Sequence, residues 1–180
     1  VAAIHAGGVE LRLEPGCPQL PDGLGGRGAV ISWYEEIPIV IVWRTTSSQH
    51  TSNYIDDAEW KMAITAAGER CLFGLRDGKW DHTRWNQLLS KSADFSEQSG
   101  LLRDSGRLDL LHLIGAALAG SGHADGSFVT RLCMLGESAI IVPNKLPASS
   151  DWQQHVIDNL HIRNLGAAAA MIAYDAINLD

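Results

Sequence analysis

The chain has 180 residues, of which 46% are hydrophobic and 19% are charged, and its net charge is −7 at pH 7. This length and composition predict a single globular domain over residues 1–180, somewhat poor in charge. Lysine and arginine are scattered along the chain without clustering. We therefore expect neither nucleic-acid binding through a basic patch nor attachment to an anionic membrane surface.

The three cysteines, Cys17, Cys71 and Cys133, are far apart in the sequence and form no Cys-x-x-Cys pair. An odd number at this spacing predicts neither a disulfide framework nor a zinc site. We expect buried free thiols in a reducing compartment, with the protein in the cytoplasm or in an intracellular assembly. The sequence predicts no signal peptide, and no apolar run is long enough to cross a membrane.

The N-terminal half is predicted to form mainly strands. Residues 9–14 alternate apolar and charged side chains, which is the period of a strand with one wet face. A loop rich in glycine and proline follows over residues 15–28. Two more strands are predicted over residues 29–34 and Ile37–Arg44. The second of these is almost wholly apolar and β-branched as far as Trp43, which indicates a strand buried on both faces at the centre of a sheet.

A helix is predicted to follow this strand after a polar connection. Asp56 and Glu59 have the spacing of a capping box, with aspartate in the place of the usual serine. Residues 72–76 form a short apolar segment, and the dipeptide Asp77-Gly78 after them is a favoured hairpin turn. The predicted helix has one apolar face, made of Trp60, Ala63, Ile64, Ala67 and Cys71.

The C-terminal half is predicted to be mainly helical. Residues 90–100 are serine-rich and aperiodic and are predicted to form a loop, and a capped helix follows over residues 104–120. Residues 128–135 are predicted to form another helix, and Ser138–Pro143 a strand stopped by proline. This order predicts an α+β fold, in which a small, mainly antiparallel sheet from the N-terminal half packs against helices from the C-terminal half.

Residues 150–180 are predicted to form the central helix of the core. Ser150 and Gln153 have capping-box spacing at its start. Residues 165–174 have no polar face, which indicates a helix buried on all sides, and Gly166 marks an expected break or kink before them. Part of this second half is the predicted contact with a second subunit. The residues expected at that interface are Leu165, Ala169, Ile172 and Tyr174.

The polar connection after the strand Ile37–Arg44 is the first candidate binding site. Hydroxyl and backbone N–H groups that lead into a helix N-terminus can bind an anion. Two aspartates at the helix start would oppose an anion, and no Gly-rich phosphate motif is present, so a solvated surface loop is the alternative. The candidate ligand-binding residues are Arg44, Thr45, Ser47 and Ser48.

Asp81 and His82 are the candidate catalytic residues, with His50 as a third. An aspartate beside a histidine can tune acid–base chemistry, and nearby tryptophans can floor a pocket. The alternative is that Asp81 caps a helix that carries Trp85, and that the tryptophans are core anchors. Adjacent residues on a helix also point apart, which weakens the catalytic hypothesis.

His123 and Asp125 are two potential ligands separated by one residue, and they could take part in a metal site. Further ligands would have to come from elsewhere, and no spacing selects among the remaining histidines. A flexible polar turn is the alternative, and we expect no metal and no cofactor. The histidines available as further ligands are His5, His50, His155 and His161.

No linear catalytic motif is present: the sequence contains no Gly-x-Ser-x-Gly, no His-Glu-x-x-His, no phosphate loop and no dinucleotide fingerprint. Two functional hypotheses remain. The first is a non-catalytic protein that assembles with itself or binds another protein, as a structural subunit or a partner-binding module. Low charge, acidic balance and six tryptophans support it. The second is a small hydrolase-like enzyme whose histidine, aspartate and arginine converge from loops.

Overall fold

The apolar run 37–44 forms β1 (Ile37–Arg44), an inner strand of a four-stranded sheet. The computed structural model describes residues 37–46, 57–73, 82–133 and 136–172. Within these residues the strand order is β2-β3-β1-β4, and every neighbouring pair is antiparallel. The other strands are β2 (Phe128–Leu132), β3 (Ser138–Pro143) and β4 (Leu165–Ile172).

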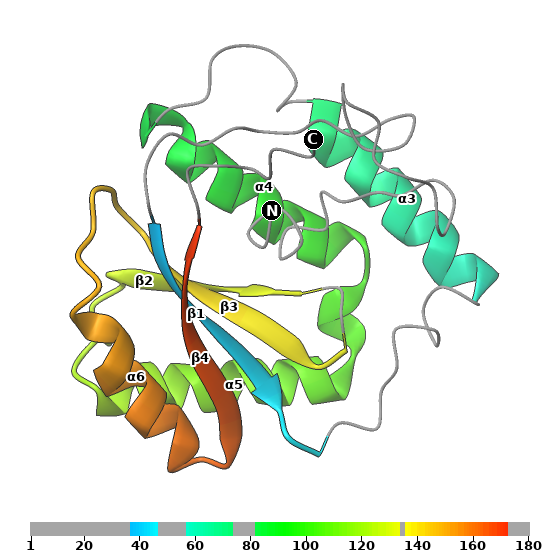
Figure 1. The fold of residues 1–180 in the computed structure, drawn as a ribbon. Helices are drawn as coiled ribbons and strands as arrows, with labels where there is room; N and C mark the ends of the chain where they lie inside the picture. Colours follow the sequence, from blue (N-terminus) through cyan, green and yellow to red (C-terminus); the bar gives the residue numbers. More distant parts are fainter. Residues whose placement is uncertain (1–36, 47–56, 74–81, 134–135, 173–180) are drawn as a thin grey trace, which may run out of the picture.

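Both faces of β1 are covered by helices, as its composition predicts. Successive side chains of a strand point to opposite faces, and Ile37 and Ile39 belong to the core cluster that includes the first turns of α4 (Trp85–Gln98). Val40 and Val42 belong to the cluster on the other face, with α5 (Ser105–Gly120) and α6 (Trp152–His161). Figure 1 shows α4 on one side of the sheet and α5 and α6 on the other. The predicted burial of β1 on both faces is confirmed.

The starts of two predicted helices are confirmed by their capping contacts. The carboxylate of Asp57 accepts hydrogen bonds from the N–H groups of Glu59 and Trp60 (2.8 and 3.0 Å) and begins α3 (Ala58–Phe73), which packs along α4. Asp104 does the same for the first turn of α5. Asp56, the predicted cap of α3, lies outside the described residues. Residues 72–73 were predicted to belong to a separate apolar segment after the helix, but they form the last two positions of α3.

The predicted helix over residues 165–174 is wrong, because residues 165–172 are the strand β4. α6 ends at His161, and the chain turns at Asn164, which has a positive φ of 58°, before pairing with β1 along its full length. The predicted break near Gly166 is confirmed. Four consecutive alanines have no strand preference of their own, so pairing with β1 overrides their helical propensity.

Two other predicted elements also differ from the structure. Residues 128–132 form a strand instead of a helix, and their side chains alternate between the two faces of the sheet. Residues 90–98 continue α4 instead of forming a loop. Ser96 is buried there because its hydroxyl donates to the carbonyl oxygen of Ser92 one turn earlier (3.2 Å), which satisfies a polar group inside the helix.

The fold is α+β with an antiparallel sheet, as predicted. Among the described strands, β1 comes from the N-terminal half, whereas β2, β3 and β4 come from the C-terminal half. The strands predicted over residues 9–14 and 29–34, and the return strand of the hairpin after residue 78, lie outside the described residues. None of the helices in the described part of the chain is long and apolar enough to span a membrane.

Candidate functional site

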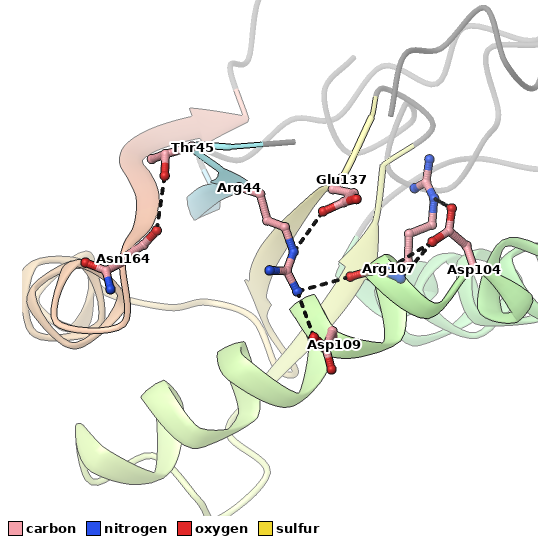
Figure 2. Close-up of polar contacts among 8 residues, drawn as sticks. Arg44, Thr45, Asp104, Arg107, Asp109, Glu137 and Asn164 are labelled. Carbon is pink, nitrogen blue, oxygen red and sulfur yellow. Dashed lines mark hydrogen bonds and ion pairs between the residues drawn. The ribbon is translucent and has the colours of Figure 1, made fainter. Parts of the chain in front are cut away.

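Arg44, a predicted ligand-binding residue, is bound into the fold at the end of β1. Its Nε lies 2.8 Å from Oε2 of Glu137, and its Nη2 lies 3.3 Å from Oδ2 of Asp109 and 3.5 Å from the carbonyl oxygen of Gly106. Figure 2 shows the guanidinium reaching from β1 to α5 between these partners. The Glu137 side chain is 9% exposed and that of Asp109 is 74% exposed. The buried contact is therefore the one with Glu137.

Glu137 precedes β3 and lies against the first turn of α5. A Cβ at Gly106 would be 2.6 Å from Oε1 of Glu137, so any other residue at position 106 would force the carboxylate to shift. A negative charge is favoured there by the helix dipole. The backbone N–H of Arg44 also donates to the carbonyl oxygen of Glu137 (3.1 Å). These contacts hold the end of β1, the start of β3 and the start of α5 together.

A second arginine of this region, Arg107, is completely buried. Its Nε lies 3.9 Å from Oδ2 of Asp104, and Nη1 donates to the carbonyl oxygen of Cys133. The half-buried Arg44 and the buried Arg107 thus each have a carboxylate nearby, which offsets part of the cost of burying the charge. The sequence did not single out Arg107 or Glu137. The only indication of this contact in the sequence was Gly106, a glycine in the first turn of a predicted helix.

Of the remaining residues predicted to bind a ligand or to act in catalysis, the structure describes only Thr45 and His82. The hydroxyl of Thr45 donates to the carbonyl oxygen of Asn164 (3.3 Å), so the fold accounts for Thr45 without a ligand. His82 begins the short turn η1 (His82–Arg84) before α4. Trp85 is a core anchor, since it is buried and its indole N–H donates to the carbonyl oxygen of Pro143 (2.7 Å). The residues outside the described part are Ser47, Ser48, His50 and Asp81.

Three of the four predicted interface residues, Leu165, Ala169 and Ile172, belong to β4, which is an edge strand among the described residues. Leu165 and Ile172 are buried in the core of this chain, so their side chains are not available to a partner. Ala169 is exposed, and Met171 is 44% exposed. Tyr174 lies outside the described residues. The strand contains no charged residue and no proline. It therefore lacks the residues that usually prevent an edge strand from pairing with another chain.

An open cleft of about 820 Å³ lies beside the start of α6. It brings His155 of α6 to the same cleft as His123 and Asp125, which precede β2. Within the described residues, no three His, Cys, Asp or Glu side chains are close enough together to hold a metal ion. The cleft is a candidate site for an organic ligand, and sequence spacing could not indicate it.

The polar wall of the cleft is fixed by backbone contacts. The carboxylate of Asp125 accepts hydrogen bonds from the hydroxyl and the N–H of Ser127 (2.7 and 3.0 Å), and these bonds lower the pKa of Asp125. Asn144 donates from its backbone to the carbonyl oxygen of Ser127 (2.8 Å) and from its side chain to that of Gly126 (3.1 Å). Gly126 has a φ of 78°, which favours glycine. The loop therefore presents an ionised, oriented carboxylate.

The floor of the cleft is aromatic. The rings of His123 and Phe128 meet edge to face with centroids 4.9 Å apart, and those of Phe128 and Trp152 are 4.3 Å apart. Trp152 is 6% exposed, and among the described residues its indole N–H has no hydrogen-bond acceptor. A buried N–H without an acceptor is costly, and such groups mark places where a water or a ligand belongs.

Two of the three cysteines are described, and both are buried free thiols, as predicted. Burial raises the pKa of Cys71 and of Cys133, which disfavours the reactive thiolate. Cys17 lies outside the described residues.

Comparison with known proteins adds no relative: no family model matches the chain, and neither a curated protein nor a solved structure has significant similarity to it.

Proposed function

We propose that this protein acts by assembly, with a second copy of itself adding to the sheet at the outer edge of β4. The observation that carries this proposal is that β4, an edge strand among the described residues, is eight residues long and contains no charged residue and no proline. Strands of this kind pair readily with another strand, because their outward N–H and C=O groups lack partners. A second copy is the favoured partner because a two-fold axis pairs β4 with itself antiparallel, and the small alanine side chains do not collide.

Exposed apolar side chains around β4 support the same assignment. Trp43 lies opposite Gly166 in the strand register, Ile162 is in the turn before β4, and Met171 is near its end. All three are exposed, and they account for half of the large exposed hydrophobic residues in the described structure. Exposed apolar side chains beside the outer edge of β4, which no other described strand pairs with, indicate an interaction surface. The buried free thiols fit a role in a reducing compartment.

The test is light scattering coupled to size-exclusion chromatography, on the full chain at several concentrations. We expect a dimer that dissociates on dilution, and we expect Ala169→Lys to be monomeric at the same concentrations. A lysine at the centre of an edge strand opposes pairing with a second edge because its charge would be desolvated and would face its own copy. The matched control is Ala119→Lys, which replaces another exposed alanine, on α5, and this variant should remain dimeric.

A wild-type chain that is monomeric at every concentration would refute the proposal. A dimer that Ala169→Lys leaves intact would assign the contact to another surface. Circular dichroism of both lysine variants establishes that each is folded before the oligomeric states are compared.

A further inference from the structure

We propose that a pocket between α4 and β2 binds a phosphate group, either as the free ion or as the monoester of a small molecule. The pocket has a volume of about 310 Å³. Among the described strands, β2 is the edge strand opposite to β4, and the pocket contains no residue of β4. The inference therefore does not rest on the proposed assembly. The described residues that line the pocket are Asn86, Leu89 and Ser90 of α4, Arg131 of β2, and Asn144 and Lys145 after β3.

Of the described residues that line this pocket, the two charged ones are both cationic. Arg131 and Lys145 lie beside three neutral polar side chains and one leucine, and the described lining includes no carboxylate. Within the described part of the chain, neither Arg131 nor Lys145 forms an ion pair with an aspartate or a glutamate. The pocket therefore offers two positive charges that no carboxylate neutralises, although the chain as a whole is acidic.

Arg131 is held in place by groups that carry no negative charge. Its Nε donates to the carbonyl oxygen of Leu89 (3.0 Å) and its Nη1 to that of Thr130 (2.8 Å). These bonds fix the guanidinium without neutralising it, and burial lowers the pKa of Arg131 because it disfavours the charged form. Arg44 and Arg107, by contrast, each have a carboxylate nearby. An anion in the pocket would offset the cost of burying the charge of Arg131 in the same way.

The guanidinium of Arg131 also keeps a donor for a ligand. Among the described residues its Nη2 has no hydrogen-bond partner, and this nitrogen is not one of the buried polar atoms that lack a partner. It is therefore accessible to water, and a ligand in the pocket can replace that water. Two bonds to the backbone orient the guanidinium before a ligand arrives, so less side-chain entropy is lost on binding.

The charges and donors of the pocket favour a dianion. A phosphate group carries about −1.5 to −2 charges at pH 7, which matches Arg131 and Lys145 together, whereas a carboxylate neutralises only one of them. The side chains of Asn86, Ser90 and Asn144 can donate to the remaining phosphate oxygens. A cation would be repelled by both charged residues, and an apolar ligand would leave them without partners.

The charges around the pocket favour a small ligand over a polyanion. The pocket shares Asn144 and Lys145 with the cleft beside the start of α6, and that cleft is also lined by Asp125 and Asp151. A nucleic acid would bring further phosphates towards these carboxylates and towards a chain with a net charge of −7. A single phosphate group, alone or on a small molecule, meets the two cations without that repulsion.

The experiment follows the Nε–H signal of Arg131 by NMR in the full, ¹⁵N-labelled chain, with the signal assigned from Arg131→Gln. The bond from this N–H to the carbonyl oxygen of Leu89 slows its exchange with water and makes the signal observable. The probes are inorganic phosphate, glycerol phosphate, acetate and choline at millimolar concentration and constant ionic strength. We expect both phosphate compounds to shift the signal, acetate to shift it much less, and choline not at all. Tighter binding of glycerol phosphate would assign a monoester, and equal or tighter binding of inorganic phosphate the free ion.

Three variants separate the pocket from a general effect of charge. Lys145→Gln changes an exposed side chain and should weaken phosphate binding by about three- to tenfold without affecting the fold. Arg131→Gln, followed through the amide signals of the pocket, should weaken it by about tenfold or more, the loss expected for a hydrogen bond between charged groups. Arg103→Gln removes an exposed arginine that is not among the residues lining the pocket, and it should leave binding unchanged.

Three outcomes would overturn the inference. The first is that neither phosphate compound shifts the Arg131 signal, and the second is that acetate binds as tightly as phosphate. The third is that Arg103→Gln weakens phosphate binding as much as Lys145→Gln does, because the attraction would then come from the charge of the whole chain.

Discussion

Replacing Glu137 by glutamine tests whether ion pairing at the end of β1 holds α5 on the sheet. Arg44 has two carboxylate partners, and they differ in burial: the Glu137 side chain is 9% exposed, whereas that of Asp109 is 74% exposed. Glu137→Gln and Asp109→Asn each remove the negative charge of one partner of Arg44, with little change in the shape of that partner's side chain. The pair of variants therefore isolates the effect of burial.

The expected losses of stability differ severalfold. Breaking a buried ion pair costs about 3–5 kcal/mol because the remaining charge is left uncompensated. Arg44 is 24% exposed and keeps some contact with water, so we expect Glu137→Gln to lower the free energy of unfolding by about 2–3 kcal/mol. Asp109→Asn removes a solvent-exposed contact, for which about 0–1 kcal/mol is typical.

Urea denaturation followed by circular dichroism measures both losses as shifts of the midpoint at constant slope. Repeating it in high salt adds a second criterion, because salt screens the exposed contact and leaves the buried one largely unaffected. Equal losses for the two variants, or a loss below about 1 kcal/mol for Glu137→Gln, would refute the conclusion that the buried contact stabilises this end of the sheet.

Three further outcomes are expected. Asp104→Ala should lower stability by about 3–5 kcal/mol because α5 loses its cap and the completely buried Arg107 loses its nearby carboxylate, and Asp104→Asn should recover only the share of the cap, about 1–2 kcal/mol, in the same urea assay. Gly166→Ala places a Cβ against the indole of Trp43, so we expect a loss of about 1–3 kcal/mol and a red shift of tryptophan fluorescence; an unchanged spectrum would contradict this packing. Burial raises the pKa of Cys133, so the folded state keeps a proton that the unfolded chain releases. The stability of the folded state that depends on this protonated thiol is fully present below the thiol's unfolded pKa of about 8.5, and it is lost as the pH rises through the folded pKa. The urea midpoint of wild type should therefore fall more between about pH 7 and about pH 10 than that of Cys133→Ala.

The elements that were predicted correctly are those whose own residues show the pattern of a strand or of a helix. β1 is apolar at nearly every position, which a strand covered on both faces requires, and α5 has an aspartate at its cap followed by a helical pattern. Residues 165–172 carry the opposite signal, since alanine favours a helix. Their strand conformation comes from pairing with β1, which lies more than a hundred residues earlier and which no local pattern reveals.

The candidate site was predicted in part. The sequence identified the pair His123 and Asp125 but could not select His155 from the other histidines, because the three line one cleft only in the folded chain, where the start of α6 lies near the start of β2. The polar stretch after β1 suggested a ligand for Arg44, yet its partners in the fold are Glu137 and Asp109. A charged side chain that binds a ligand and one that joins two elements look alike in a sequence.

The position of β1 in the sheet also decides when the protein can fold. Val40 pairs with Ile141 on one side and with Ala169 on the other, so both neighbours of β1 are synthesised long after it. On the ribosome, this strongly apolar strand has neither native partner until β3 and then β4 have emerged. Such long-range pairing makes folding slow and leaves an aggregation-prone segment exposed in the nascent chain. Synthesis of this protein should therefore depend on chaperones that shield apolar segments until the chain is nearly complete.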